Sequence, residues 1–73
     1  MFKEHSQVAL SSPLPHLGLP AGALGVVIHV HGQGVAYEVE FFDASERTLG
    51  VETLSAQQLK ATAFPPGVHP AHA

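Results

Sequence analysis

Two histidines, His29 and His31, are the residues whose spacing comes nearest to a chemical site. One residue separates them, so on an extended strand both imidazoles project from the same face. Histidines at this spacing can bind Zn²⁺, Cu²⁺ or Ni²⁺ when further ligands are near, and Glu38 is the best-placed third ligand. Because no other ligand motif accompanies them, two surface histidines beside a turn are the simpler interpretation. These three residues are metal candidates at most, and no bound cofactor is predicted.

Three glutamates are expected on the outer face of a sheet: Glu38, Glu40 and Glu52. The hairpin register places Glu38 opposite Glu52, and like charges that face each other across strands are mildly destabilising. The carboxylates are either an acidic patch for a basic protein or an ordinary solvated face, and the solvated face is the simpler interpretation. Acid–base chemistry would require a cleft that separates their pKa values, and no pattern in the chain predicts one.

The remaining residue types point away from an enzyme. The chain has no cysteine, so it has neither a thiolate nucleophile nor a disulfide. Gly22 and Gly25 lack the Lys-Ser/Thr that would follow them in a phosphate-binding loop. No serine lies in a nucleophile elbow or beside triad partners; the serines are Ser6, Ser11, Ser12, Ser45 and Ser55. Catalysis is not expected.

Length and charge restrict the function further. A chain of 73 residues forms one domain at most, and a hydrophobic content of 45% is sufficient for a small core. The net charge is −3 and the fixed cations are Lys3, Arg47 and Lys60, so a nucleic-acid-binding surface is not expected. The first residues lack the apolar run of a signal peptide, and no stretch approaches the roughly 20 apolar residues that span a bilayer. We expect a cytoplasmic protein that does not contact a membrane.

The clearest structural pattern is the alternation of apolar and polar residues over residues 35–42. It predicts a strand with the glutamates on its wet face. The residues expected on its buried face are Val35, Tyr37, Val39 and Phe41. Further strands are expected over residues 7–10, 24–31 and 60–64, and in a segment that ends at Leu54.

The register of both hairpins follows from the faces that must point inward. Val26, Ile28 and Val30 can face the core together with residues 35–42 only if Val30 lies opposite Val35. That pairing requires a turn of even length, either residues 32–33 or residues 31–34. A loop of residues 43–47 then gives the pairs Phe41–Leu49, Val39–Val51 and Tyr37–Thr53.

The connecting segments complete the architecture. Proline and glycine make residues 11–19 an irregular loop and residues 19–22 a type I turn. Ser55 and Gln58 form a capping box, flanked by Leu54 and Leu59 as a hydrophobic staple, which predicts one 3₁₀ turn before the last strand.

This order of elements is that of a small all-β domain, an SH3-like five-stranded barrel. It would occupy residues 1–64, and closure of the barrel would remove exposed strand edges. Three prolines end regular structure after Phe64, so residues 65–73 are expected to form an extended Pro/His-rich tail.

Three motifs resemble a family of short bacterial proteins. They are Gly22-Ala23-Leu24-Gly25-Val26-Val27, Ala36-Tyr37-Glu38-Val39-Glu40-Phe41 and Arg47-Thr48-Leu49. Together they are similar to domain-of-unknown-function family 4926 (DUF4926), over residues 8–59. The resemblance implies an SH3-like barrel and a small bacterial protein, but no established activity and no catalytic residues. The Pro/His tail and the pairing of His29 with His31 lie outside the shared pattern.

We therefore expect a non-enzymatic protein-interaction module, an accessory or regulatory subunit of a larger bacterial complex or a homo-oligomer. The outer sheet face and the loop of residues 14–19 would carry the contact, and the Pro-rich tail would wrap onto the partner. The expected partner-binding residues are Leu14, Leu17, Leu19, Glu38, Glu40, Glu52, Phe64, Pro65, Pro66 and Val68. The alternative is an antitoxin or immunity-type protein, because a small acidic chain suits a basic enzyme target.

Overall fold

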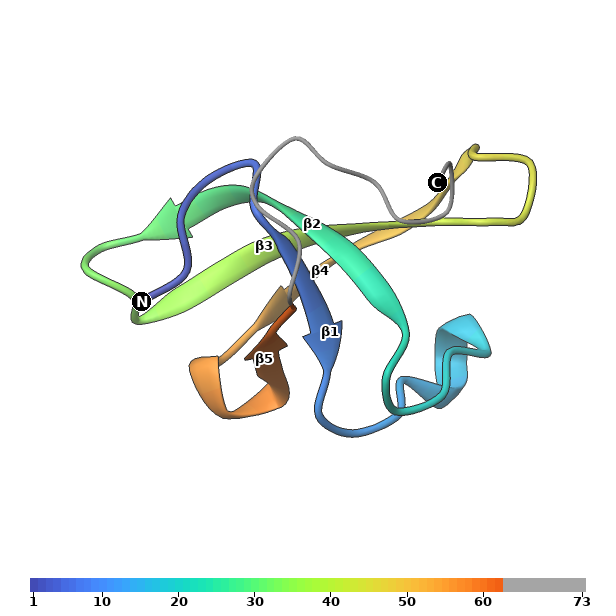
Figure 1. Ribbon diagram of the computed structural model, residues 1–73, viewed down its shortest axis with the longest axis horizontal. Helices are drawn as coiled ribbons and strands as arrows, with labels where there is room; N and C mark the ends of the chain where they lie inside the picture. Colours follow the sequence, from blue (N-terminus) through green and yellow to red (C-terminus); the bar gives the residue numbers. More distant parts are fainter. Residues whose placement is uncertain (63–73) are drawn as a thin grey trace.

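The computed structural model describes residues 1–62 and arranges them as one antiparallel sheet of five strands (Figure 1). The strands are β1 (Gln7–Leu10), β2 (Leu24–His31), β3 (Ala36–Phe42), β4 (Thr48–Leu54) and β5 (Leu59–Ala61). Their order across the sheet is β4-β3-β2-β1-β5, and β4 and β5 do not pair with each other. The all-β prediction is confirmed, whereas the sheet is open rather than closed into a barrel. The expected tail, and residues 63–64 of the expected last strand, lie outside the described residues.

The core lies on the inner face of the sheet and is built around β3. Tyr37, Val39 and Phe41 are at most 1% exposed, whereas Glu38 and Glu40 between them are half-buried on the opposite face. This alternation confirms the pattern expected for the strand. The other members of the core cluster are Val8, Leu10, Leu14, Val27, Leu54 and Leu59.

A β-bulge at Ile28 sets the register between β2 and β3. The partners on either side of it are Val27–Val39 and His29–Glu38. The extra residue brings Val27 and Val30 to the inner face although they are three positions apart. The expectation that Val26 and Ile28 face inward is therefore wrong: Val26 is half-buried on the other face, and Ile28 is 38% exposed at the bulge.

The turn between β2 and β3 has even length, as expected, but lies one residue later than the expected four-residue turn. It consists of residues 32–35, because His31 pairs with Ala36 and Val30 with Tyr37. The expected pairing of Val30 with Val35 is wrong, and Val35 is 79% exposed in the loop instead.

A second bulge, at Leu49, shifts the register between β3 and β4 by one residue. The loop of residues 43–47 is as expected, since Phe42 pairs with Thr48. Beyond the bulge the observed pairs are Phe41–Gly50, Val39–Glu52 and Tyr37–Leu54, in place of the expected Phe41–Leu49, Val39–Val51 and Tyr37–Thr53. As a result Glu52 belongs to the inner face and Val51 to the outer face.

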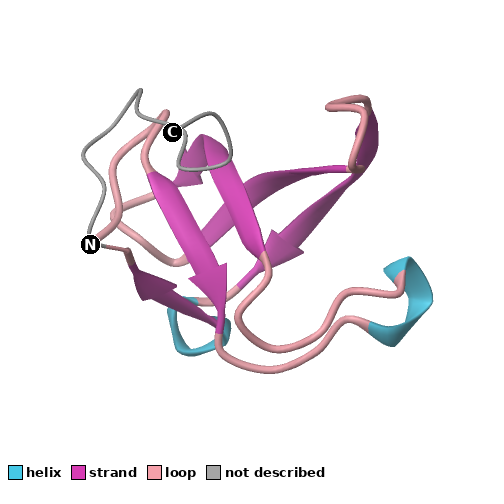
Figure 2. Ribbon diagram, turned by 45° about the vertical axis from the view of Figure 1, so that its right-hand side comes forward, coloured by secondary structure: helices cyan, strands magenta, loops and turns pink. Residues whose placement is uncertain are grey.

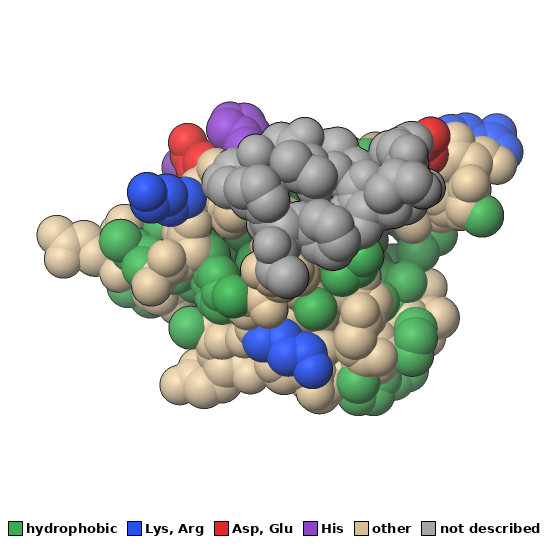
Figure 3. Space-filling view, viewed as in Figure 1, with side chains coloured by type: hydrophobic (Ala, Val, Ile, Leu, Met, Phe, Trp, Pro, Cys, Tyr) green, Lys and Arg blue, Asp and Glu red, His purple; other side chains and the backbone are tan. Residues whose placement is uncertain are grey.

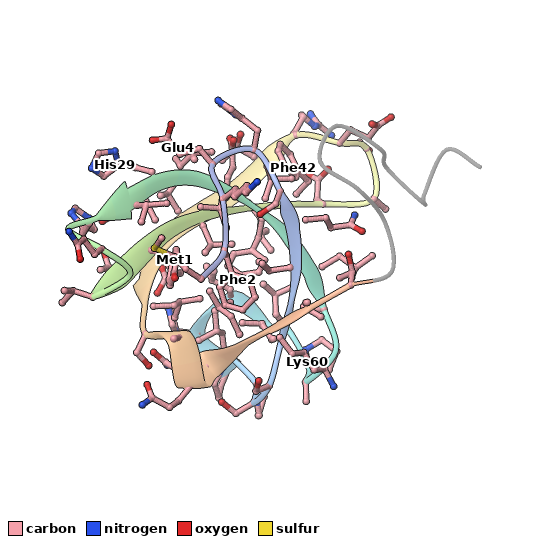
Figure 4. The ribbon with its side chains drawn as sticks, turned by 60° about the vertical axis from the view of Figure 1, so that its left-hand side comes forward. Met1, Phe2, Glu4, His29, Phe42 and Lys60 are labelled. Carbon is pink, nitrogen blue, oxygen red and sulfur yellow. The ribbon has the colours of Figure 1, made fainter. Side chains whose placement is uncertain are left out.

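The N-terminal segment covers one end of the core, which the sequence did not indicate. The Phe2 ring meets the Tyr37 ring edge-on, with 5.2 Å between ring centroids. The Phe2 backbone N–H donates a hydrogen bond to the Tyr37 hydroxyl at 3.2 Å, and the His5 N–H donates to the Val27 carbonyl. Figure 4 shows Phe2 among the side chains enclosed by the strands.

The loop between β1 and β2 contains a short 3₁₀ segment, η1 (Pro15–Leu17), at its tip (Figure 2). Leu14 and Leu19 form an isolated antiparallel bridge that closes this tip. The expected type I turn at residues 19–22 is wrong. The Ala23 N–H donates to the Pro20 carbonyl, and Gly22 has a φ of 89°, which is the geometry of a type II turn one residue later.

The 3₁₀ turn before the last strand is confirmed as η2 (Ala56–Gln58). Ser55 and Gln58 form the expected capping box, in which the Ser55 N–H donates to Gln58 Oε1 at 2.9 Å. Leu54 and Leu59, the expected staple residues on either side, both belong to the core cluster. The chain therefore turns sharply at η2 and returns as β5 beside β1.

Candidate functional site

The outer face of the sheet, opposite the core, carries the candidate site. The cross-strand partners Val26, Glu40 and Val51 define this face, and positions two residues away along each strand share it. Toward one end it bears the apolar residues Leu24 and Phe42. Toward the other end it bears the polar residues His29, His31, Glu38 and Thr53. The two ends therefore differ in what they can bind.

Large apolar side chains are exposed at the first end. We call Leu24, Phe42 and Val51 the apolar patch; they are 44%, 39% and 46% exposed. Leu49, at the bulge of β4, is 40% exposed. Single exposed apolar residues are ordinary, but several on one face of a small domain are typical of a surface that contacts another group.

A groove of about 580 Å³ opens beside the apolar patch. Its lining residues are Gln7, Leu19, Ala23, Leu24, Val26, Phe42, Asp43, Ala44 and Glu46. The Asp43 carboxylate accepts hydrogen bonds from the backbone N–H groups of Ser45 and Arg47, so it organises its own turn. The groove has the size of a ligand site, but its lining offers apolar contact rather than a nucleophile and a base.

The polar end holds three side chains that the sequence singled out as metal candidates. His31 Nε2 donates to Glu38 Oε2 at 2.6 Å, and His29 Nδ1 lies 3.6 Å from Glu4 Oε2. Figure 4 shows Glu4 and His29 side by side. The two imidazole rings meet edge-on at 4.8 Å between centroids. Within residues 1–62, no group of three or more His, Cys, Asp and Glu side chains is arranged to hold a metal ion. This result includes the candidate ligands His29, His31 and Glu38.

Hydrogen bonds lower the pKa of Glu38 below its ordinary value. The largest cause is the bond from His31, followed by the bonds from the Thr53 hydroxyl at 2.8 and 3.0 Å. Desolvation opposes this lowering of the pKa, and the electrostatic interactions with His31 and His29 add to it. A carboxylate with a lowered pKa stabilises the fold above its unfolded-state pKa, and this contribution is lost as pH falls through the folded-state pKa.

His31→Ala is expected to raise the pKa of Glu38 toward its ordinary value, because it removes the strongest donor. The pKa is measured by NMR titration of the Glu38 side-chain carboxyl carbon. Thr53→Ser keeps a hydroxyl donor at the second position and is the control, with little expected change. An unchanged Glu38 pKa in His31→Ala would show that the two side chains do not interact in solution.

Among residues 1–62, the structure does not bring the expected partner-binding residues together on one surface. Glu38 and Glu40 lie on the outer face as expected, where they accept hydrogen bonds from Thr53 and Thr48. Glu52 was expected beside them, but the bulge at Leu49 places it on the inner side. There its carboxylate accepts a hydrogen bond from His16 Nε2 at 2.8 Å.

The loop leucines pack toward the core of the protein. Leu14 is 7% exposed and is a core residue, so it is not available for surface contact. Leu17 and Leu19 are half-buried and pack against the core cluster. Leu19 also lines the groove. The other expected contact residues, Phe64, Pro65, Pro66 and Val68, lie outside the described residues.

The basic side chains form no patch on the described part of the surface. Lys3, Arg47 and Lys60 come from the N-terminal segment, the loop of residues 43–47 and β5. Figure 3 shows the Lys and Arg side chains of one face as separate groups. Among residues 1–62, no helix has the length and apolar character that crossing a membrane requires.

Fold and surface together define the class of protein: a small all-β domain with one open antiparallel sheet and an apolar groove on its outer face. The chain matches the family model "Domain of unknown function (DUF4926)" over residues 4–61. Because this match covers more than half of the chain, the protein belongs to the DUF4926 family, as the three sequence motifs indicated. Comparisons with curated proteins and with solved structures found no match.

Proposed function

We propose that the protein is a non-enzymatic module that binds another protein through the outer face of β3 and β4. The observation that carries the proposal is the exposure of large apolar side chains on β4, Val51 at 46% and Leu49 at 40%. Burying them against a partner would be favourable by about 25 cal/mol per Å² of apolar surface. Glu38 and Glu40 on the same face would favour a partner with Lys or Arg at the contact.

The position of β4 supports this proposal. β4 ends the strand order, so its outer backbone groups have no neighbouring strand among residues 1–62. It is seven residues long and bears neither lysine nor proline, the residues that commonly protect an exposed edge. An extended segment of a partner could add to this edge and cover Val51 at the same time.

We further propose that the fold is a partly open SH3-like barrel. The strand order β4-β3-β2-β1-β5 places the first and last strands side by side and a three-stranded meander beyond them, as such a barrel requires. The remaining gap between β4 and β5 is where a partner would reach the sheet edges.

In this proposal the protein serves as an accessory or regulatory subunit of a larger cytoplasmic bacterial complex. An antitoxin or immunity-type role is the alternative, and the net charge of −3 is the observation that favours it. The partner in that case is a basic enzyme. Binding would then weaken strongly with added salt, and co-expression would relieve the enzyme's toxicity.

Val51→Lys is expected to reduce recovery of the partner by about tenfold or more, because a charged side chain would replace apolar contact area. The measurement is an affinity pull-down with the full chain from the cells that produce it, quantified by mass spectrometry. Gln57→Lys adds the same charge at an exposed position on η2 and is the matched control.

The two variants separate a specific surface from a general effect of charge. Loss of the same protein with Val51→Lys but not with Gln57→Lys supports the proposed face. Equal recovery with the wild-type chain and with Val51→Lys would place the contact elsewhere.

A further inference from the structure

We propose that the chain's own C-terminal segment, Phe64 to Val68, occupies the groove beside the apolar patch within the same molecule. This inference goes beyond the proposed function and stands without it. It assigns an occupant to the groove, whereas the protein partner is assigned to the outer face of β3 and β4. Four features carry it: the chemistry of the groove, the place where the described chain ends, the length of chain that follows, and the composition of that chain.

The groove offers mainly apolar surface along its length. Leu24 and Phe42, which form two of its walls, are 44% and 39% exposed. Leu19, Ala23 and Val26 add apolar surface from the loop and from β2. Surface of this kind is favourably covered by apolar side chains that do not need hydrogen-bond partners of their own.

The described chain ends beside the groove. The Thr62 hydroxyl donates hydrogen bonds to the backbone carbonyl of Gln7 and to Gln7 Oε1, each at 3.4 Å. Gln7 is 8% exposed and is itself a lining residue of the groove. Because β5 pairs with β1, the chain after Thr62 starts beside β1, the strand that borders the groove.

The chain that follows is long enough to cross the groove. Extended chain spans about 3.3–3.6 Å per residue, so Phe64 can lie up to about 7 Å and Val68 up to about 21 Å from Thr62. The groove runs from β1 over β2 to the end of β3. The segment leaves from β5, which lies three strand spacings, about 14 Å, from β3, so Val68 can still reach Phe42 and the loop of residues 43–47.

The composition of the segment fits this surface. Phe64, Pro65, Pro66 and Val68 are apolar, and the prolines favour an extended polyproline II conformation that loses little entropy on binding. Pro-rich segments commonly bind in grooves that are lined by aromatic side chains, and Phe42 is the aromatic residue in the lining of this groove. Val68 is followed by His69 and His72 and by no acidic residue. This composition suits the acidic end of the groove, which Asp43 and Glu46 form.

A second hollow near Thr62 is an alternative binding place for the C-terminal segment. A smaller hollow of about 330 Å³ is lined by the N-terminal residues and by the end of β5: Met1, Phe2, Lys3, Ser6, Gln7, Ala61 and Thr62. It is shallower and offers less apolar surface than the groove. We therefore assign the segment to the groove, and the experiment distinguishes the two destinations.

The test is NMR spectroscopy of the full chain labelled with ¹³C and ¹⁵N. Nuclear Overhauser effects (NOEs) are expected between the Phe64 ring or Val68 methyls and the side chains of Leu24, Val26 or Phe42. Order parameters of the Phe64, Gly67 and Val68 amides are expected above about 0.6, the range of ordered backbone. A sample that mixes labelled and unlabelled chains shows whether the contacts are intramolecular.

Two variants sharpen the test. Leu24→Lys introduces a charge into the groove and is expected to lower the order parameter of Val68 below about 0.6. Val51→Lys carries the same charge on the same face but outside the groove lining, and is expected to leave that value unchanged. Phe64→Ser, which alters no described residue, gives the same release without disturbing the sheet.

Several results would overturn the proposal. They are order parameters below about 0.6 in the wild-type chain, NOEs to Met1 or Phe2 in place of Leu24 and Phe42, or NOEs only between different molecules. The proposed protein contact fails separately, through the Val51→Lys pull-down. An ordered segment in the groove with no effect of Val51→Lys on partner recovery would therefore support this inference and refute the other.

Discussion

Phe41→Ala is expected to lower the free energy of unfolding by about 3–5 kcal/mol. Phe41 is 1% exposed and is among the largest fully buried side chains, so its removal leaves a cavity that the surrounding strands cannot fill. A chain of 73 residues has a total stability of roughly 4–11 kcal/mol. The variant should therefore melt about 12–40 °C below the wild-type chain, as measured by circular dichroism, or be unfolded outright.

Phe42→Ala is the matched control, because it makes the same chemical change at the next residue. Phe42 is 39% exposed on the outer face, so it loses less buried surface and leaves no enclosed cavity. We expect its effect on the free energy of unfolding to be less than half that of Phe41→Ala. Equal effects would show that the inner and outer faces of β3 are not distinct in solution.

This contrast rests on the part of the fold that the sequence predicted best. Strict alternation identified β3 and its inner residues, because a half-buried strand repeats every two residues. The capping box at Ser55 and Gln58 predicted η2 for a similar reason, since its residue types serve the backbone of one local turn. Local patterns with a local physical cause were sufficient for these elements.

The register of the hairpins could not be predicted in the same way. Alternation favoured Val26, Ile28, Leu49 and Val51 as inward residues because they are apolar. The large aromatic rings of β3 already fill the core, so the strands on either side of β3 place a glycine against Phe41. Gly50 of β4 pairs with Phe41, and Gly25 of β2 lies beside the Phe41 ring. The bulges at Ile28 and Leu49 produce this arrangement, and they depend on fitting volumes in three dimensions.

The candidate site was predicted only in part. Glu38 and Glu40 were assigned to the correct face because they alternate with the core of β3. Glu52 was misplaced by the bulge, and its partner His16 is 36 residues away in sequence. The groove joins β1, β2, the end of β3 and two loops, so no local pattern predicts it. Leu24 and Val26 had been assigned to a strand, but only the register shows that they face outward.

Gly25→Ala is expected to lower the free energy of unfolding by about 1–3 kcal/mol, the cost of forcing extra volume into a packed core. A Cβ at Gly25 would lie 2.7 Å from Phe41 Cε1 and 2.7 Å from Val39 Cγ1. Both side chains are fully buried, so neither can move away freely. The measurement is urea unfolding followed by circular dichroism.

Gly50→Ala is the matched control, since it makes the same change in β4, the strand on the other side of β3. The nearest atom to a Cβ there is Leu17 Cδ2 at 3.2 Å, the end of a half-buried side chain on a loop. That side chain can shift, and alanine reduces the entropy of the unfolded chain by about 0.4–1 kcal/mol. We expect a net change near zero, and a loss as large as that of Gly25→Ala would contradict the packing argument.

A double variant tests whether the Phe41 ring causes the loss at Gly25. Phe41→Leu is destabilising by itself, but leucine lacks the ring atom that lies closest to a Cβ at Gly25. In the Gly25→Ala background, Phe41→Leu should therefore lower the free energy of unfolding by less than it does in the wild-type chain. The loss in the double variant should be smaller than the sum of the two single losses by about 0.5 kcal/mol or more. Strict additivity would mean that Val39 or the backbone accounts for the strain. The absence of a side chain at Gly25 would then have a cause other than the aromatic ring beside it.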